Sequence, residues 1–244
     1  MRGYQAGDDS HTERVTSINE PDSGAPAWQR ATRGEPRWHV SLVVLSIIAL
    51  QLMLPPSING GFVPLVPLVE LVLLVALFAL NPRRIDRPEP WLRYLGLTLT
   101  VVISIANVVS MVRLISSMIT GTATNDPVGL LGFGANVWIT NVLVFALLFW
   151  ELDRGGPVKR ALMPDPTPDF LFPQMQLAAS SDQFQDWEPR VLDYLYVSFT
   201  NATAFSPTDT MPLSRWAKVT MMIESAVSLM AVALVVARAV NILH

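Results

Sequence analysis

Four ionisable side chains interrupt otherwise apolar stretches of this sequence: Glu70, Arg113, Glu224 and Arg238. A charge at the centre of a bilayer is costly unless it is paired or reached by water, so each of them marks either a structural contact or a pathway for ions or protons. Glu70 and Arg113 lie at similar depths in two consecutive stretches. Their positions predict an ion pair between neighbouring helices, which could fix helix packing or form part of an ion or proton pathway.

Glu224 shares one helical face with Ser228, Ala231 and Val235. That face is small and partly polar, which is typical of a helix that meets protein or a water-filled cavity rather than lipid. A hydrogen bond to a neighbouring helix and a place on a pore wall both remain open for Glu224. Three amides inside apolar stretches are expected to be interhelical hydrogen-bond partners: Asn107, Asn136 and Asn141.

The sequence lacks the common motifs of soluble enzymes. It has 0 Cys and 3 His, and the histidines lie far apart. It also lacks GxSxG, P-loop, HExxH and GxGxxG motifs, so we expect no enzymatic activity, no metal ion and no cofactor. A net charge of −3 argues against a generally basic nucleic-acid binder. The run FWELDRGGP, with Glu151, Asp153 and Arg154, is interpreted as a cap on a helix that ends at Gly155-Gly156.

Composition indicates where these side chains are held. Of the 244 residues, 51% are hydrophobic and 15% are charged, against about 25% charged in soluble domains. Five apolar stretches are long enough to cross a bilayer: 38–54, 62–80, 91–118, 132–150 and 212–243. The sequence therefore predicts an all-α integral membrane protein with five transmembrane helices and one short re-entrant or interfacial helix.

Four regions follow along the chain. Residues 1–37 are polar and rich in Gly, Pro, Ser and Asp, which predicts a disordered cytoplasmic tail. Residues 38–150 form the four-helix transmembrane region, and 151–189 form a polar, proline-rich connection. Residues 190–244 hold the short helix, a loop and the last transmembrane helix.

Lys and Arg residues are distributed unevenly around the predicted spans. The N-terminal tail, loop 81–93 and loop 151–190 hold five, four and four of them, whereas loops 55–61 and 119–131 hold none. Because positive loops stay in the cytoplasm, this asymmetry predicts a multi-pass protein of a bacterial plasma membrane, with a cytoplasmic N-terminus and an external C-terminus.

The segment DYLYVSFTNATAFSPTDTMPLSRWAKV is the most distinctive pattern in the chain. A half-length apolar stretch, a Thr-rich turn with an Asp and a long final helix resemble the pore-helix, filter and inner-helix module of the two-helix potassium-channel superfamily. The whole chain is similar to multi-span membrane proteins of high-GC Gram-positive bacteria that carry a degenerate form of this module. The resemblance implies a homo-oligomer, a tetramer if channel-like, with a filter-like loop made of Asn201, Thr203, Phe205, Ser206, Pro207, Thr208 and Asp209.

Two departures argue against potassium selectivity. Ser206 and Thr208 stand where a potassium filter needs glycines, and Pro207 fixes its own φ and restricts Ser206. The charge asymmetry also places residues 190–210 on the cytoplasmic side, whereas a potassium-channel pore loop enters from outside. Asp209 is expected to cap a final helix that begins near Pro212, and its charge could also attract cations at a pore mouth.

Three functions are consistent with these residues. The first is a channel-like oligomer without potassium-type selectivity, in which the loop lines a path for other ions. The second is a non-conducting membrane scaffold or partner-docking protein. The third is a proton-coupled transporter that uses Glu70, Arg113 and Glu224. The bilayer is the partner common to all three, and no nucleic-acid partner is expected.

The predicted orientation can be tested with alkaline phosphatase fusions, because this enzyme is active only outside the cytoplasm. Fusions after residues 60 and 244 should be active, and fusions after residues 87 and 170 should be inactive. An active fusion after residue 170 would reverse the orientation and place the 190–210 loop on the side from which a potassium-channel pore loop enters.

Overall fold

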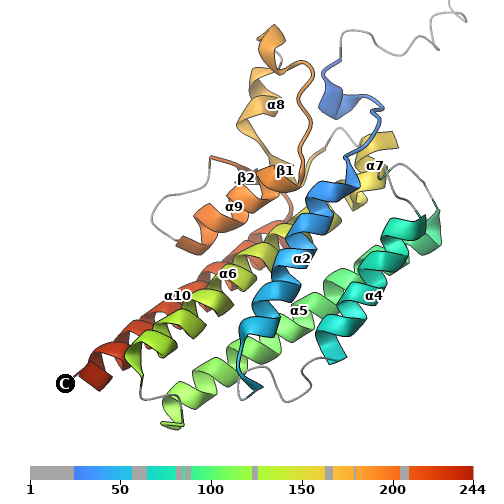
Figure 1. Ribbon diagram of the computed structural model, residues 1–244. Coiled ribbons are helices and arrows are strands. Elements are labelled where there is room, and N and C mark those ends of the chain that lie inside the picture. The colour runs from blue at the N-terminus through green and yellow to red at the C-terminus, as the bar shows by residue number, and fades with distance from the viewer. Residues whose placement is uncertain are drawn as a thin grey trace, which may run out of the picture.

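The structure, a computed structural model, describes residues 25–56, 65–80, 85, 89–122, 126–162, 167–178, 180–203 and 209–243. This part of the chain is almost entirely helical (Figure 1). Its α-helices are α2 (Arg37–Met53), α4 (Leu65–Leu80), α5 (Pro90–Ile119), α6 (Pro127–Leu152), α7 (Pro157–Leu162), α8 (Pro173–Leu177), α9 (Val191–Thr203) and α10 (Arg215–Leu243). Short 3-10 helices and strands connect them: η1 (Ala27–Gln29), η2 (Asp153–Gly155), β1 (Phe170–Leu171), η3 (Asp182–Phe184) and β2 (Met211–Pro212). The predicted all-α fold is confirmed.

Three helices of the described chain are long and apolar enough to cross a membrane: α5, α6 and α10. Helices α2 and α4 are also apolar but have 17 and 16 residues, fewer than the about 20 that usually cross a hydrocarbon core of about 30 Å. Three of the five expected spans therefore have the length that a bilayer requires. A crossing by α2 and by α4 stays a prediction.

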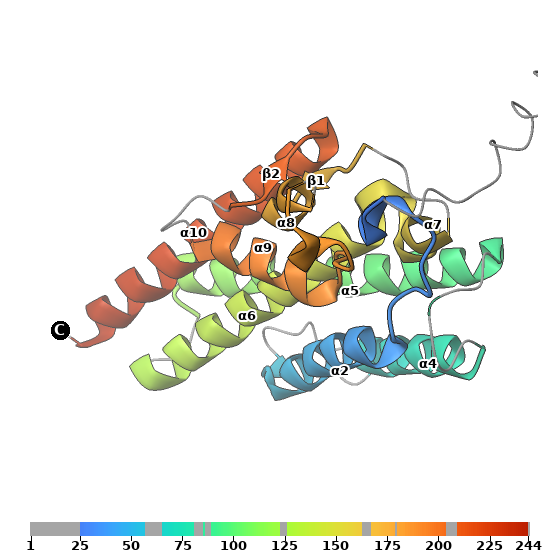
Figure 2. The same cartoon turned by 90° about the horizontal axis from the view of Figure 1, so that it is seen from above.

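Helix α6 is the centre of the bundle. It packs against α10 and α9 on one side and against α5 and α2 on the other. Helix α4 packs against α2 and α5 at the edge of the bundle, far from α10 (Figure 2). The C-terminal half of α6 is accordingly apolar on nearly all faces, as expected of a helix surrounded by others. Its buried residues include Val144, Ala146, Leu147 and Phe149.

Helix α9 is the short helix that the sequence predicts after residue 190, and it packs against both α6 and α10. Its bounds differ from the expectation, because Asn201 and Thr203 form its last turn rather than a loop. The final helix also begins later than Pro212. Residues 211–212 pair with 170–171 as an antiparallel two-stranded sheet, with Phe170 opposite Pro212. Helix α10 then begins at Arg215, and the Ser214 hydroxyl accepts a hydrogen bond from the Ala217 N–H at 3.4 Å.

Residues 25–37, which the sequence assigns to a disordered tail, are part of the described structure. The predicted tail therefore extends too far toward the C-terminus. Residues 1–24 of that tail lie outside the described residues. Trp28 is buried in the core cluster, and this apolar anchor offsets the entropy of ordering the polar residues around it. The Ala27 N–H donates to the Gln185 carbonyl and the Thr32 N–H to the Ala161 carbonyl, both at 2.7 Å.

Close contact between α6 and α10 depends on Gly134. A Cβ atom at this position would lie 2.7 Å from both methyl groups of Val235, so Gly134→Ala should overpack the crossing and lower the free energy of unfolding by about 1–3 kcal/mol. Gly132, in the same helix, has nothing within 4 Å of its would-be Cβ. Gly132→Ala should be neutral or should stabilise the protein by up to about 1 kcal/mol through helix propensity. Unfolding in detergent measures both, and equal effects would mean that the crossing does not require a glycine.

Candidate functional site

Glu224 lies at the centre of the pore-like module. Its side chain on α10 is buried, and its carboxyl group contacts two residues of α9. One carboxyl oxygen forms a short hydrogen bond with the Ser198 hydroxyl, and the other accepts from the Asn201 side-chain amide at 2.6 Å. The Asn201 amide also donates to the Met221 carbonyl at 2.9 Å, and the Ser225 hydroxyl donates to the Asn201 side-chain oxygen at 3.0 Å. These bonds fix α9 on the first half of α10.

The Ser198 hydroxyl lies between two oxygen atoms, one of Glu224 and one of Val142. It also lies 2.7 Å from the Val142 carbonyl of α6, which can only accept. A serine hydroxyl has one proton, so it cannot donate to both oxygens. All three groups are satisfied when Ser198 donates to Val142 and a protonated Glu224 donates to Ser198. An ionised Glu224 would instead accept the Ser198 proton, and Val142 would keep only its helical hydrogen bond.

A line of amides extends this polar contact through the bundle. Asn107 on α5 donates to the Asn141 side-chain oxygen on α6 at 2.9 Å, and Asn141 donates to the Ser228 hydroxyl on α10 at 3.1 Å. Ser228 is one helical turn beyond Glu224. Asn136 donates to the Leu50 carbonyl of α2 at 3.0 Å. The predicted role of these amides, and the hydrogen-bonded alternative for Glu224, are confirmed.

The predicted ion pair between Glu70 and Arg113 is wrong. Glu70 is buried on α4, and it accepts a hydrogen bond from the Gln51 amide of α2 at 3.1 Å. Arg113 is exposed on α5. Similar depth did not bring the two together, because the face of α5 that packs in the bundle carries Ser110 and Leu114, and Arg113 lies beside that face.

The filter-like residues fall into three groups. Asn201 and Thr203 end α9, where the Thr203 hydroxyl donates to the Thr200 carbonyl at 2.9 Å. Phe205, Ser206, Pro207 and Thr208 lie outside the described residues, so the role of that loop stays a prediction. Asp209 is exposed and precedes β2. Its predicted role as a helix cap is wrong, because the strand pair separates Asp209 from the start of α10 at Arg215.

A buried polar cluster that the sequence did not predict lies at the C-terminal end of α6. We call this end, where Arg154 and Arg160 follow the helix, the Arg-rich end. Asp153 follows the last residue of α6 and is fully buried. It accepts hydrogen bonds from the Tyr194 hydroxyl at 2.5 Å and from the Asp169 N–H at 3.1 Å, and the Arg154 Nε lies at 3.5 Å. Burial raises the pKa of Tyr194 well above its usual range, which keeps the phenol protonated and donating. The Arg160 guanidinium lies over the Tyr194 ring, 5.2 Å from its centroid.

Asp169 extends this cluster to α10. Its carboxylate accepts from the Arg154 N–H at 2.8 Å and from the Trp216 indole at 2.9 Å. The expected end of the helix at Gly155-Gly156 is confirmed within one turn, since the chain reverses through Arg154, Gly155 and Gly156, all with positive φ. The partners Asp169 and Tyr194 are 16 and 41 residues away in sequence, and no local pattern links them to Asp153.

Glu35 attaches the N-terminal segment to the same end of the bundle. Its carboxylate accepts from the Trp150 indole at 2.9 Å and from the Val191 N–H at 3.1 Å. Burial raises the pKa of Glu35, and these two hydrogen bonds oppose the rise. Because Val191 is the first residue of α9, the Glu35 carboxylate also lies where the helix dipole favours negative charge.

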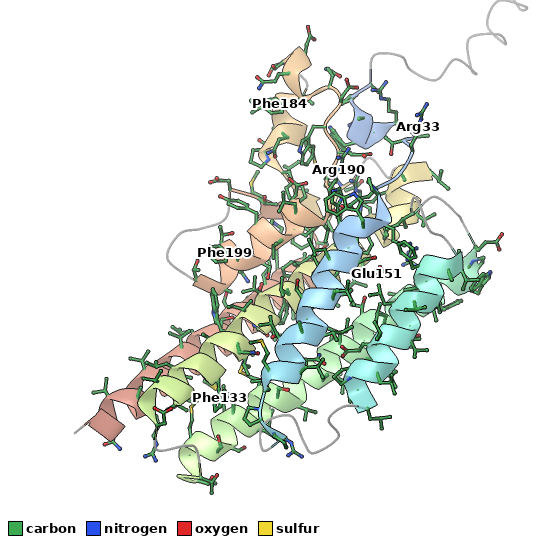
Figure 3. The ribbon with its side chains drawn as sticks, viewed as in Figure 1. Arg33, Phe133, Glu151, Phe184, Arg190 and Phe199 are labelled. Atoms are coloured by element: carbon green, nitrogen blue, oxygen red, sulfur yellow. The ribbon has the colours of Figure 1, made fainter. Side chains whose placement is uncertain are left out.

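The outward face of α9 is apolar and aromatic. Trp138 of α6 packs edge-on against Phe199, with ring centroids 6.0 Å apart. Figure 3 labels Phe199 beside the C-terminal half of α9. These two residues line a groove of about 830 Å³ beside α9, together with Leu192 and Tyr196 of the same helix.

Neither a protein-family model, a curated protein nor a solved structure matches the chain. The geometry is thus the evidence on function. What it offers is a set of polar contacts that join helices: Asp153 at one end of α9 and Glu224 at the other. Within the described residues, no group of three or more His, Cys, Asp or Glu side chains is placed to hold a metal ion.

Substitutions at Glu224 test its role as a neutral hydrogen-bonding group. Glu224→Gln reproduces the protonated acid, since its amide can donate to Ser198 and accept from Asn201, so its free energy of unfolding should lie within about 0.5 kcal/mol of the parent. Glu224→Leu removes both functions and should cost about 1–3 kcal/mol. Unfolding in mixed detergent micelles measures the difference. A Gln variant as unstable as the Leu variant would show that the site requires an ionised carboxylate.

Proposed function

We propose that the chain is a non-conducting, multi-pass membrane scaffold in which the pore-like module joins helices of a single chain. The observation that carries this proposal is the direction of the polar groups of α9. Ser198 and Asn201 donate inward, within the same chain, to Val142 and Glu224. A pore module that lines an ion path needs such groups on a surface that water can reach, and here Ser198 and Glu224 are both fully buried.

The outer surface of α10 supports the same proposal. Every exposed residue from Val219 to Val240 is apolar. In an oligomeric channel the inner helix lines a wet passage, and a wet passage requires polar groups or carbonyls. An entirely apolar face is suited to lipid or to the apolar surface of another membrane helix.

The Arg-rich end supplies what a scaffold would present to soluble partners. Residues 25–36 and the connection after α6 form a folded cap above the long helices (Figure 1). The cap is held by Asp153 and Glu35, and it exposes polar side chains such as Gln183 and Asp186. The charge asymmetry of the sequence supports a cytoplasmic position for this cap.

A proton-coupled transporter is the second candidate, and one observation favours it. Glu70 and Glu224 are both buried in the bundle, and both accept hydrogen bonds from neutral side chains. Intramembrane acids of this kind can carry protons. A pH-sensitive dye inside liposomes tests this role, because proton uptake that disappears in Glu224→Gln would favour transport over the scaffold.

Conduction can be measured directly with the full chain in liposomes. The scaffold predicts a cation flux equal to that of empty liposomes, for the parent protein and for Asp209→Asn alike. A flux above this background that falls in Asp209→Asn would overturn the proposal and favour a channel-like homo-oligomer whose acid attracts cations.

Water access to α10 provides an independent measurement, since the chain has 0 Cys and any introduced thiol is unique. Ser228→Cys is conservative in size and should resist a charged thiol reagent, because Ser228 is fully buried. Arg215→Cys, at the exposed start of the same helix, should react and serves as the control. Rapid labelling of Ser228→Cys would indicate a wet passage beside α10.

A further inference from the structure

A second feature of the structure lies on the other side of α6. A cavity of about 490 Å³ opens among α2, α4, α5, α6 and α7. Its deeper wall is apolar and includes Val44, Leu74, Leu77 and Leu99, whereas its outer part is lined by charged side chains. Glu151, one of the lining residues, lies between α2 and α4 in the view of Figure 3. The cavity therefore has an apolar end and a charged end, as an amphiphile does.

Two residues that line this cavity each carry a side-chain donor that has no hydrogen-bond partner within the described part of the chain. Arg37 is more than nine-tenths buried, and its Nε atom has no hydrogen-bond partner among the residues that the structure describes. The Ser41 hydroxyl, one turn further along α2, is buried and is also without a partner. Both residues line the cavity. A buried donor without an acceptor is costly, and an arginine beside a hydroxyl is a donor set suited to phosphate or ester oxygens.

The charges at this end are unequal. Arg37, Arg93 and Lys159 face the cavity together with Glu89 and Glu151, which leaves one excess positive charge. A single phosphodiester carries one negative charge and would neutralise it. Arg93 and Lys159 are exposed, so they are able to reach a headgroup at the mouth while Arg37 and Ser41 bind deeper.

The position in the bundle fits a lipid of one leaflet. The charged end of the cavity lies where α6 ends and α7 begins, the end that the charge asymmetry assigns to the cytoplasm. Basic pockets between transmembrane helices on that side bind the headgroups of anionic lipids, which the cytoplasmic leaflet supplies. The apolar wall extends from this end between α2, α4 and α5, along the direction that an acyl chain would take.

We propose that this cavity binds one anionic glycerophospholipid, with its phosphodiester on Arg37, Ser41, Arg93 and Lys159 and an acyl chain against Val44, Leu74, Leu77 and Leu99. The proposal requires that the chain be embedded in a membrane, as proposed above, but it does not depend on whether the protein conducts. Liposome flux and lipid binding therefore succeed or fail separately.

Native mass spectrometry of the full chain, purified in mild detergent, tests the site with phosphatidylglycerol as the probe. We expect one phosphatidylglycerol retained per chain, and a rise in melting temperature that phosphatidylcholine and inorganic phosphate do not reproduce. Lys159→Gln, at an exposed position, should weaken phosphatidylglycerol binding about fivefold, since a basic residue near the headgroup contributes about 1 kcal/mol. Ser41→Ala should weaken it by roughly tenfold through the lost bond to a charged acceptor.

Lys218→Gln is the matched control. It removes an exposed lysine near the start of α10, outside the cavity lining, and should leave the affinity unchanged. Equal retention of phosphatidylcholine would show that no headgroup is recognised. An equal melting shift with inorganic phosphate would indicate an anion site rather than a lipid site, and an equal loss in Lys218→Gln would indicate non-specific surface charge. Each of these three results would overturn the proposal.

Discussion

The Arg-rich end of the molecule depends on one buried carboxylate, that of Asp153. A fully buried charge is stable only when donors surround it, and the donors to Asp153 come from three different parts of the chain: the adjacent Arg154, the backbone of Asp169 and the hydroxyl of Tyr194. To satisfy this one group, the connection after α6 must fold back and α9 must begin beside the end of α6. The fold of the cap therefore depends on hydrogen bonds to the Asp153 carboxylate as well as on apolar contacts among the residues of the cap.

Helix α9 is fixed at both ends as a consequence. Tyr194 holds its first turn to Asp153, and Ser198 and Asn201 hold its second half to α6 and α10. Two residues near the end of α6 face opposite ways. Glu151, in its last turn, lines the charged cavity, whereas Asp153, just after the helix, contacts Tyr194 of α9.

Much of the fold follows from the sequence by local rules. Apolar stretches gave the long helices, and a small, partly polar face correctly indicated that Glu224 meets protein. Local rules failed where partners are distant. Glu70 contacts Gln51 rather than Arg113 because depth along a helix does not determine the direction of a side chain. The start of α10 moved to Arg215 because residues 211–212 pair with 170–171, and Trp28 ordered a segment whose composition alone is typical of disorder. In the Asp153 cluster, Asp153 contacts Tyr194 across 41 residues and Asp169 contacts Trp216 across 47, separations at which no periodicity is informative.

The position of Glu224 also constrains how the protein is made. Ser198 and Asn201 of α9 precede their carboxyl partner by 26 and 23 residues, so the ribosome synthesises both of them before Glu224. Val142 of α6 precedes Ser198 in the chain, whereas both acceptors of the Asn201 amide, Met221 and Glu224, follow it. The contacts of α9 with α6 can therefore form before α10 has been synthesised, whereas its contacts with α10 must form later.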